Sequence, residues 1–119
     1  PVIAPIGIGD DGKTYNINAD LVAGKMAHIL QAGKYLILTN TTGILDEKDN
    51  LIKSINADQV RKLIKKGIIS KGMLPKVESA LEAVSSGVEH VQIIDGTIDH
   101  SVLLELFTDS GIGTMIRRL

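Results

Sequence analysis

Residues 35–46 have the sequence YLILTNTTGILD, in which a short apolar run is followed by polar and glycine-containing residues. The run from Tyr35 to Leu38 is too continuously apolar for a half-exposed strand, so it predicts a buried one. Residues 39–50 predict a loop. Buried strands of this kind are typical of parallel sheets covered by helices, and this stretch therefore predicts an α/β fold.

Helix patterns lie on both sides of this strand. Asn18 is a suitable N-cap for a helix with one apolar stripe, and Gly33 stands where a glycine would end it. Further along, Asn56 and Gln59 have the spacing of a capping box, and Gly67 is placed to close the helix that they open.

The second half of the chain continues the alternation. A helix is predicted from about residue 75 to 86, with Pro75 in its first turn, and Asp99 is expected to cap a last helix. Residues 91–94 predict another buried strand, and residues 114–116 a closing one. The pattern predicts a single α/β domain over residues 1–119 with a largely parallel sheet.

Composition excludes several classes of function. The 119 residues carry 13 basic and 14 acidic side chains, which is not the cationic excess that nucleic-acid binding normally needs. No apolar run is long enough to span a bilayer, and the start does not resemble a signal peptide. The chain has no cysteine, which excludes thiol catalysis and cysteine-held zinc and fits the cytoplasm. The chain starts at Pro1 and leads directly into an apolar run, from which we expect a piece of something longer.

The segment GIGDDG at residues 7–12 matches the G-x-G-x-x-G pattern of dinucleotide-binding folds. That fingerprint needs a helix at the third glycine and an acidic residue about 20 positions further on. Residues 13–17 have the pattern of a strand, and residues 30–35 hold no acidic side chain. We therefore reject the fingerprint and predict a hairpin that turns at Asp11 and Gly12.

Polar residues near predicted helix starts are open to two interpretations. Asn16 and Asp20 are either ordinary strand-end and first-turn residues or a polar platform for a substrate and a cation. Lys76 is either an exposed lysine compensated by Glu78 or, together with free helix N–H groups, a phosphate ligand. The loop at residues 39–46 is either a plain connection or a ligand site beyond the end of a strand.

The three histidines, His28, His90 and His100, lack metal-ligand spacing. We therefore expect no zinc held by the protein. No Ser/His/Asp arrangement can be argued from the sequence, and we expect no catalytic triad.

Three segments, YNINAD at 15–20, LTNTTGILD at 38–46 and GIISKGMLPKV at 67–77, closely resemble the acetylglutamate kinases. The segments at 94–96 and 103–116 match as well. The resemblance covers essentially the whole chain but corresponds only to the C-terminal, nucleotide-binding part of that family's subunit. It implies half of an amino-acid kinase fold, a three-layer αβα sandwich with a mainly parallel sheet.

The resemblance implies ATP-dependent phosphorylation of the side-chain carboxylate of N-acetyl-L-glutamate, a step of arginine biosynthesis. Lys76 would stabilise the transition state, and Asp20 would orient Lys76 together with a lysine from the missing half. Asn16 would bind the acetylglutamate backbone. Mg²⁺ would arrive with ATP. The nucleotide would be surrounded by Asn40, Thr41, Thr42, Gly43, Ile44 and Leu45 on one side and Ile68, Ile69 and Ser70 on the other.

Some residues depart from the family pattern. Asn40 stands where an aspartate is usual, and Lys71 replaces a commoner glycine or acidic residue. Glu105 and Gly111 match the effector site of arginine-inhibited members, but Gln92 stands where those members usually have a histidine. Inhibition by L-arginine therefore stays an open expectation.

The family's glycine-rich phosphate loops, a second lysine and a substrate-clamping arginine all precede the part that this chain resembles. We expect an isolated fragment to be inactive, with the N-terminal half of the subunit as its partner and a homo-oligomer in the intact protein. Three alternatives stay open: a related carboxylate kinase for an aminoadipate-type substrate, a nucleotide- or effector-binding module without catalysis, and a plain structural domain, which would require Asn16, Asp20 and Lys76 to lie far apart.

Overall fold

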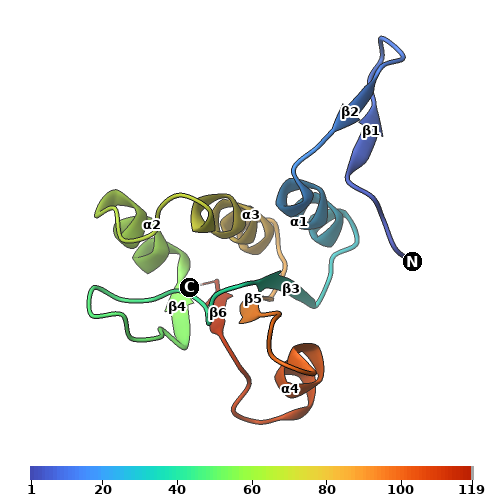
Figure 1. Ribbon diagram of the computed structural model, residues 1–119. Helices are drawn as coiled ribbons and strands as arrows, with labels where there is room; N and C mark the ends of the chain where they lie inside the picture. Colours follow the sequence, from blue (N-terminus) through green and yellow to red (C-terminus); the bar gives the residue numbers. More distant parts are fainter. Residues whose placement is uncertain (119) are drawn as a thin grey trace.

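The computed structural model describes residues 1–118, which form an α/β body with a projecting hairpin (Figure 1). The hairpin consists of β1 (Ile6–Ile8) and β2 (Thr14–Asn16), paired antiparallel. The predicted hairpin is confirmed, but its turn spans residues 9–12, because the N–H of Gly12 donates to the carbonyl of Gly9 at 2.9 Å. Gly12 has a φ of +75°, whereas Asp11 does not take the positive φ that was predicted for it. Because a strand and not a helix follows the third glycine, the rejection of the dinucleotide fingerprint is confirmed.

A four-stranded sheet forms the middle layer of the body. Its strands are β3 (Lys34–Thr39), β4 (Ser54–Asn56), β5 (His90–Asp95) and β6 (Thr114–Arg117), in the spatial order β3-β5-β6-β4. The β3–β5 and β4–β6 pairs are parallel, whereas β5 and β6 are antiparallel. The sheet is therefore mixed but mainly parallel, in agreement with the prediction.

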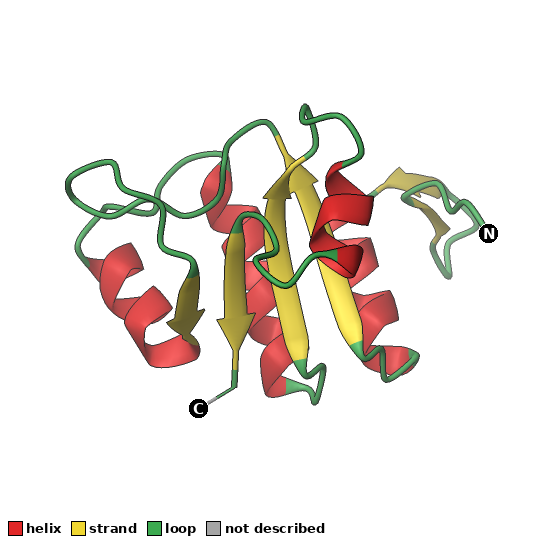
Figure 2. Cartoon of the chain, turned by 90° about the horizontal axis from the view of Figure 1, so that it is seen from below, coloured by secondary structure: helices red, strands yellow, loops and turns green. Residues whose placement is uncertain are grey.

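Helices cover both faces of the sheet (Figures 1 and 2). Three helices, α1 (Ala19–Ile29), α2 (Ala57–Lys65) and α3 (Met73–Ser85), lie on one face, and α4 (Ser101–Phe107) lies on the other. The predicted αβα sandwich is confirmed by this layering.

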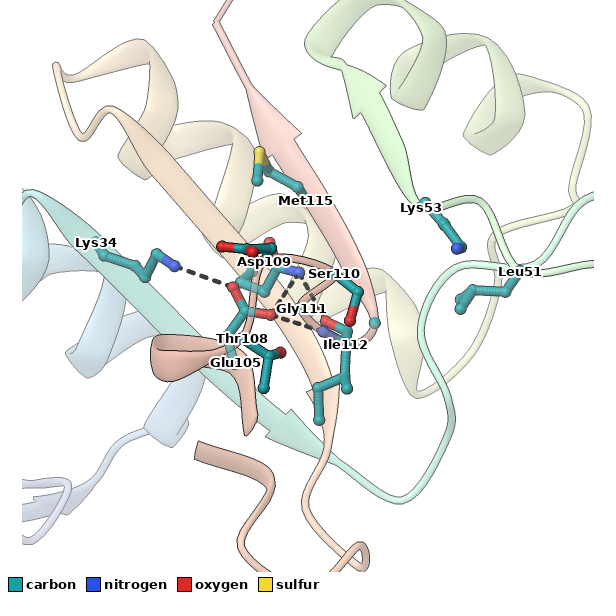
Figure 3. A pocket seen from close by; sticks show the side chains of 12 residues that line it. Lys34, Leu51, Lys53, Glu105, Thr108, Asp109, Ser110, Gly111, Ile112 and Met115 are labelled. Atoms are coloured by element: carbon teal, nitrogen blue, oxygen red, sulfur yellow. Dashed lines mark hydrogen bonds and ion pairs between the residues drawn. The ribbon is translucent and has the colours of Figure 1, made fainter. Parts of the chain in front are cut away.

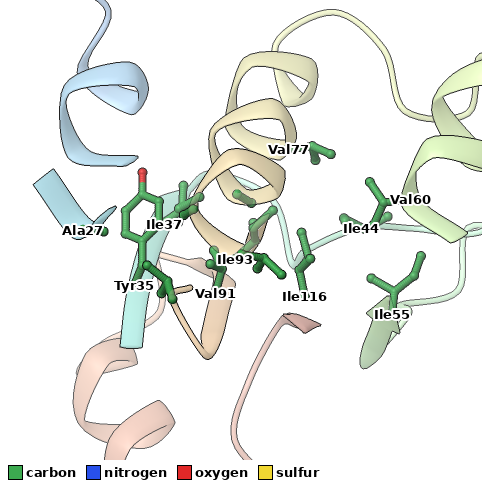
Figure 4. Close-up of a cluster of buried hydrophobic side chains, with 14 of the residues drawn as sticks. Ala27, Tyr35, Ile37, Ile44, Ile55, Val60, Val77, Val91, Ile93 and Ile116 are labelled. Atoms are coloured by element: carbon green, nitrogen blue, oxygen red, sulfur yellow. The ribbon is translucent and has the colours of Figure 1, made fainter. Parts of the chain in front are cut away.

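The core lies between the sheet and the three helices (Figure 4). Tyr35 and Ile37 of β3 stand opposite Val91 and Ile93 of β5, and all four side chains are buried. Side chains alternate between the faces of a strand, so Gln92 and Ile94 are buried on the other side of β5. Leu38 is 48% exposed, which corrects the prediction of a strand buried throughout residues 35–38.

Several helix ends agree with the prediction. Asn18 Oδ1 accepts a hydrogen bond from the backbone N–H of Asp20 at 2.9 Å. Asn56 and Gln59 form the reciprocal bonds of a capping box. Gly67 ends α2 at a φ of +74°, a left-handed conformation that glycine adopts without steric cost. Pro75 lies in the first turn of α3.

Two helix ends differ from the prediction. Gly33 does not end α1, because Gln31 takes the left-handed conformation and its side-chain amide donates to the carbonyl of His28 at 2.7 Å. Asp99 does not cap α4. His100 precedes that helix at a φ of +58°, and the N–H of Ser101 donates to the carbonyl of Ile98. The three-residue strand β4 was not predicted.

Candidate active site

Asp20 and Lys76 form an ion pair between the first turns of α1 and α3. The Lys76 ammonium lies 3.1 Å from both carboxylate oxygens of Asp20. The two side chains are 22% and 18% exposed, so the pair is mostly buried but still reached by solvent. The interpretation of Lys76 as a lysine compensated by Glu78 is therefore wrong, because its carboxylate partner comes from another helix.

The start of α3 offers fewer free N–H groups than expected. The N–H of Met73 donates to the carbonyl of Ser70, and that of Leu74 donates to the carbonyl of Lys71. Pro75 has no N–H at all. The expectation that free helix N–H groups point at a phosphate is wrong for these residues, and the Lys76 ammonium is the positive group that this helix start presents.

One departure from the family pattern, Lys71, lies two residues before α3 begins. Lys71 has a φ of +47°, in the left-handed region where glycine is favoured. The backbone here has the conformation that suits the commoner glycine, and the lysine side chain is exposed.

A cavity of about 390 Å³ lies between the two segments predicted to surround a nucleotide. Both segments contribute to its lining, with Thr41, Gly43, Ile44 and Leu45 on one side and Ile68, Ile69 and Ser70 on the other. Asn40 and Thr42 do not line it. Asp46, the last residue of the candidate loop at 39–46, also lines it, and sequence reasoning missed three further lining residues, Glu47, Asp49 and Met73.

The cavity loop is anchored to the sheet. Thr114 Oγ1 of β6 accepts a hydrogen bond from the N–H of Ile44 at 2.8 Å, and the Ile44 side chain is buried. Gly43 has a φ of +141°, and a Cβ there would lie 2.6 Å from Thr114 Oγ1. Only glycine fits this close approach of the loop to β6.

The structure does not bring all the predicted site residues together. Asn16 is exposed at the end of β2, and in the part of the chain that the structure describes its side chain has no hydrogen bond to Asp20 or Lys76. The lining residue Met73, by contrast, stands one helical turn before Lys76 on α3. The cavity and the ion pair are therefore adjacent along one helix.

Glu105 and Gly111 line a second cavity, of about 240 Å³, on the side of the sheet covered by α4 (Figure 3). Glu105 is buried, and Lys34 of β3 lies 3.0 Å from its carboxylate. The same carboxylate accepts hydrogen bonds from the Gln92 amide at 3.1 Å and from the N–H of Ile112 at 2.9 Å. Within residues 1–118, Gln92 Oε1 is the one buried side-chain oxygen or nitrogen atom without a hydrogen-bond partner.

A third hollow is an apolar groove of about 420 Å³ along α1. Its apolar lining consists of Ile17, Leu21, Val22, Met26 and Ile29. Lys25 and Glu82, at 3.9 Å from each other, stand at its side.

The comparisons with known proteins agree with this fold. The sequence profile described as "Amino acid kinase family" matches residues 1–95. The chain belongs to the amino acid kinase family.

Curated members of the family are similar to the chain over almost its whole length. An acetylglutamate kinase from Nitrosococcus oceani is 60% identical over 117 residues, which are 98% of this chain and 39% of that protein. An acetylglutamate kinase from Azoarcus sp. is 56% identical, with the same coverage. The chain thus spans about two fifths of the length of the curated relatives that it matches.

Solved structures match the fold. N-acetylglutamate synthase from Neisseria gonorrhoeae, complexed with coenzyme A and L-arginine, has a TM-score of 0.87 and 35% identity over 95% of this chain and 26% of that one. Carbamate kinase from Giardia lamblia, bound to AMP-PNP, has a TM-score of 0.71 over 93% of this chain and 36% of that one. At 21% identity, the second likeness concerns the fold alone.

No histidine, aspartate or glutamate cluster of three or more residues suited to a metal ion occurs in the described range 1–118. Among the same residues, no helix is both long and apolar enough to cross a membrane.

Proposed function

We propose that this chain is the C-terminal, nucleotide-binding part of an acetylglutamate kinase subunit. The intact subunit would transfer the γ-phosphoryl group of ATP to the side-chain carboxylate of N-acetyl-L-glutamate. The identity to acetylglutamate kinases supports the substrate, and the Asp20–Lys76 pair beside the cavity is the observation that carries the chemistry.

The acceptor chemistry matches the groups at the site. A carboxylate is already ionised at neutral pH, so its oxygen can attack the γ-phosphorus without a general base. The new P–O bond forms while the bond from the γ-phosphorus to the bridging oxygen breaks, and ADP leaves with that electron pair. Catalysis then depends on alignment and on neutralising the charge of the transferring group.

Each residue has a distinct role in this proposal. The Lys76 ammonium stabilises negative charge on the transferring group, and the Asp20 carboxylate holds that ammonium in place. Asn16, on the hairpin, binds the acetylglutamate backbone. Mg²⁺ is assigned to the phosphates of ATP, since this ion commonly keeps phosphate and water ligands and takes few from the protein.

The 390 Å³ cavity is assigned to ATP. It holds the apolar side chains of Ile44, Ile69 and Met73 next to backbone polar groups of the same segments. Ligand sites are usually lined in this way, with apolar side chains and a few polar groups that set orientation. Because Met73 and Lys76 share the first turns of α3, a nucleotide in the cavity would direct its phosphates toward the ammonium.

The remainder of the subunit is the proposed partner of the exposed apolar surface. The groove on α1 and the apolar residues of the N-terminal segment are of the kind that mark protein contacts. In this proposal the N-terminal half supplies the other phosphate-binding groups and the substrate clamp, and the intact protein is a homo-oligomer.

The second cavity is proposed as a site for L-arginine. The carboxylate of Glu105 would face a cationic ligand, but Lys34 already pairs with it. The guanidinium group of arginine would therefore have to displace Lys34 or share the Glu105 carboxylate with it, which predicts weak inhibition by L-arginine. The likeness to a synthase solved with L-arginine supports the assignment.

Substitution in the full-length protein tests the function. Lys76→Ala and Asp20→Asn should each lower kcat with acetylglutamate by about 100-fold or more, while KM for ATP changes a few-fold. Lys65→Ala and Asp58→Asn, exposed exchanges of the same kind on α2, should leave kcat unchanged.

Two outcomes contradict the proposal. If both site variants keep kcat within about threefold of the parent, the pair is not catalytic. If only ATP affinity falls, the chain belongs to a nucleotide- or effector-binding module. Assays with an aminoadipate-type substrate beside acetylglutamate separate the two carboxylate kinases.

A further inference from the structure

Ser79 connects the helix that carries Lys76 to the backbone of Asp20. The residue lies one turn after Lys76 on α3 and is 1% exposed. Its hydroxyl donates to the carbonyl oxygen of Asp20 at 2.6 Å. Lys76 and Ser79 thus contact the same residue of α1, one at the carboxylate and the other at the main chain.

Tyr35 completes this contact from the sheet. The phenol oxygen lies 3.2 Å from Ser79 Oγ and 3.3 Å from the Asp20 carbonyl. Burial raises the pKa of Tyr35, the hydrogen bond with Ser79 opposes the rise, and the negative charge of Asp20 adds to it. The phenol therefore stays protonated at neutral pH and can donate to Ser79 Oγ while Ser79 donates to Asp20.

Gly24 leaves the space that this contact needs. It lies one turn after Asp20 on α1 and is buried against α3. A Cβ at this position would overlap Ser79 Oγ and would lie 3.4 Å from the Ser79 carbonyl oxygen. Any larger side chain must therefore move the hydroxyl or push the two helices apart.

These bonds hold Asp20 at three points. Its N–H is bound by the Asn18 cap, its carbonyl by Ser79, and its carboxylate by Lys76. If the backbone of Asp20 could move freely, its carboxylate could pair with Lys76 in several rotamers. Because the backbone is fixed by hydrogen bonds, few of these rotamers remain. The buried hydroxyls are thus placed to set the position of the Lys76 ammonium through Asp20.

We infer that Ser79, seated by Tyr35 and accommodated by Gly24, is a positioning residue for phosphoryl transfer. It fixes the backbone of Asp20 relative to α3, and so keeps the Lys76 ammonium where the transferring group passes. This inference rests on the proposed kinase function. It adds a role for three residues that touch neither substrate nor nucleotide.

The test uses the full-length kinase that contains this chain. Ser79→Ala should lower kcat by roughly tenfold to a hundredfold, because small displacements of a catalytic group have effects of that size. KM for ATP should stay within about twofold, since the cavity residues are untouched. Tyr35→Phe removes only the phenol hydroxyl and should give a smaller loss in kcat.

A second variant disturbs the hydrogen bond from Ser79 to the Asp20 carbonyl without changing Ser79 itself. Gly24→Ala should lower kcat as Ser79→Ala does, and the double variant should be no slower than either single one. Ser85→Ala is the matched control on the same helix, because its hydroxyl donates only to the Glu82 carbonyl within α3. It should leave kcat unchanged.

A double-mutant cycle separates positioning from stability. In an Asp20→Asn background, Ser79→Ala should have little further effect on kcat, because the group through which it acts is already lost. Thermal unfolding of each variant gives its Tm, and kcat is measured at a temperature at which every variant is folded. A merely structural role would lower Tm and leave kcat of the folded enzyme unchanged.

The outcomes distinguish this inference from the proposed function. Unchanged kcat in folded Ser79→Ala and Gly24→Ala, with a large loss in Lys76→Ala, overturns the inference alone. A full additional loss from Ser79→Ala in the Asp20→Asn background overturns it as well. Unchanged kcat in Lys76→Ala and Asp20→Asn overturns the proposed function first.

Discussion

At the scale of a single residue, Asp46 organises a loop that lines the proposed nucleotide cavity. One oxygen of its carboxylate accepts hydrogen bonds from the N–H groups of Lys48 at 2.8 Å and Asn50 at 2.9 Å. The Asn50 amide adds a side-chain donor. The N–H of Asn50, then that of Lys48 and then the Asn50 amide lower the pKa of Asp46. A carboxylate fixed in this way ties both ends of a short turn together.

The lowered pKa of Asp46 predicts a pH dependence with a definite sign. The contribution of these hydrogen bonds to the stability of the folded state is fully present above the ordinary aspartate pKa of about 3.9. It is lost as the pH falls through the lower pKa of Asp46 in the folded state. Asn50→Ala should raise the pKa of Asp46 part of the way back, because the backbone donors remain. Carboxyl NMR titration of the full-length protein measures this value. Lys48→Gln, which keeps its backbone N–H, is the control; a midpoint unaffected by Asn50→Ala contradicts the prediction.

At the scale of an element, α2 depends on its capping box. The helix has nine residues, and helices this short have little stability of their own. Asn56 Oδ1 accepts from the N–H of Gln59 at 2.9 Å, and Gln59 Oε1 accepts from the N–H of Asn56 at 3.1 Å. Asn56 is also the last residue of β4, so the same pair joins the strand to the helix.

Removing this cap should destabilise the fold measurably. Asn56→Ala should lower the free energy of unfolding by about 1 kcal/mol, and Gln59→Ala by less. The double variant should lose less than the sum, because each side chain bonds the other's backbone. Urea unfolding measures these values, with Lys65→Ala on the same helix as the control. Equal effects of Asn56→Ala and Lys65→Ala contradict the prediction.

The elements also separate what the sequence could predict from what it could not. The caps at Asn18 and Asn56 depend on bonds that span two or three residues, so their patterns are visible locally. The end of α1 was mispredicted because the Gln31 side chain competes with Gly33 for the capping role. Strand β4 was missed because its three residues pair only with β6, 61 positions away at Ile55 and Ile116.

The candidate site, too, depends on contacts between residues far apart in the sequence. The segments around the cavity and the residues Asp20 and Lys76 were identified through the family resemblance. Their pairing joins side chains 56 positions apart, which no local pattern encodes. Ser79 and Tyr35 gave no signal at all, since a buried serine and a strand tyrosine are ordinary residues until the fold brings them to the carbonyl of Asp20.

At the scale of the whole molecule, apolar side chains are exposed on two surfaces. The N-terminal segment and hairpin expose Val2, Ile3, Ile6 and Ile8, and α1 adds Ile29 and Leu30 at its end. On the far side, α4 exposes Leu103, Leu106 and Phe107. Water-exposed patches of this kind usually mark contact surfaces. The proposed N-terminal half would cover the first group.

This surface and the proposed division of the active site lead to a prediction for the chain by itself. Residues 1–119, expressed alone, should form no acyl phosphate in a hydroxylamine trapping assay, because the Lys76 ammonium, already paired with the Asp20 carboxylate, neutralises only part of the negative charge that phosphoryl transfer develops. Adding the separately expressed N-terminal part of the subunit should restore turnover and reduce binding of an apolar dye. The same mixture made with Lys76→Ala should stay inactive. Robust turnover by the 119 residues alone would overturn the proposed division, because the pair and its cavity would then suffice for catalysis.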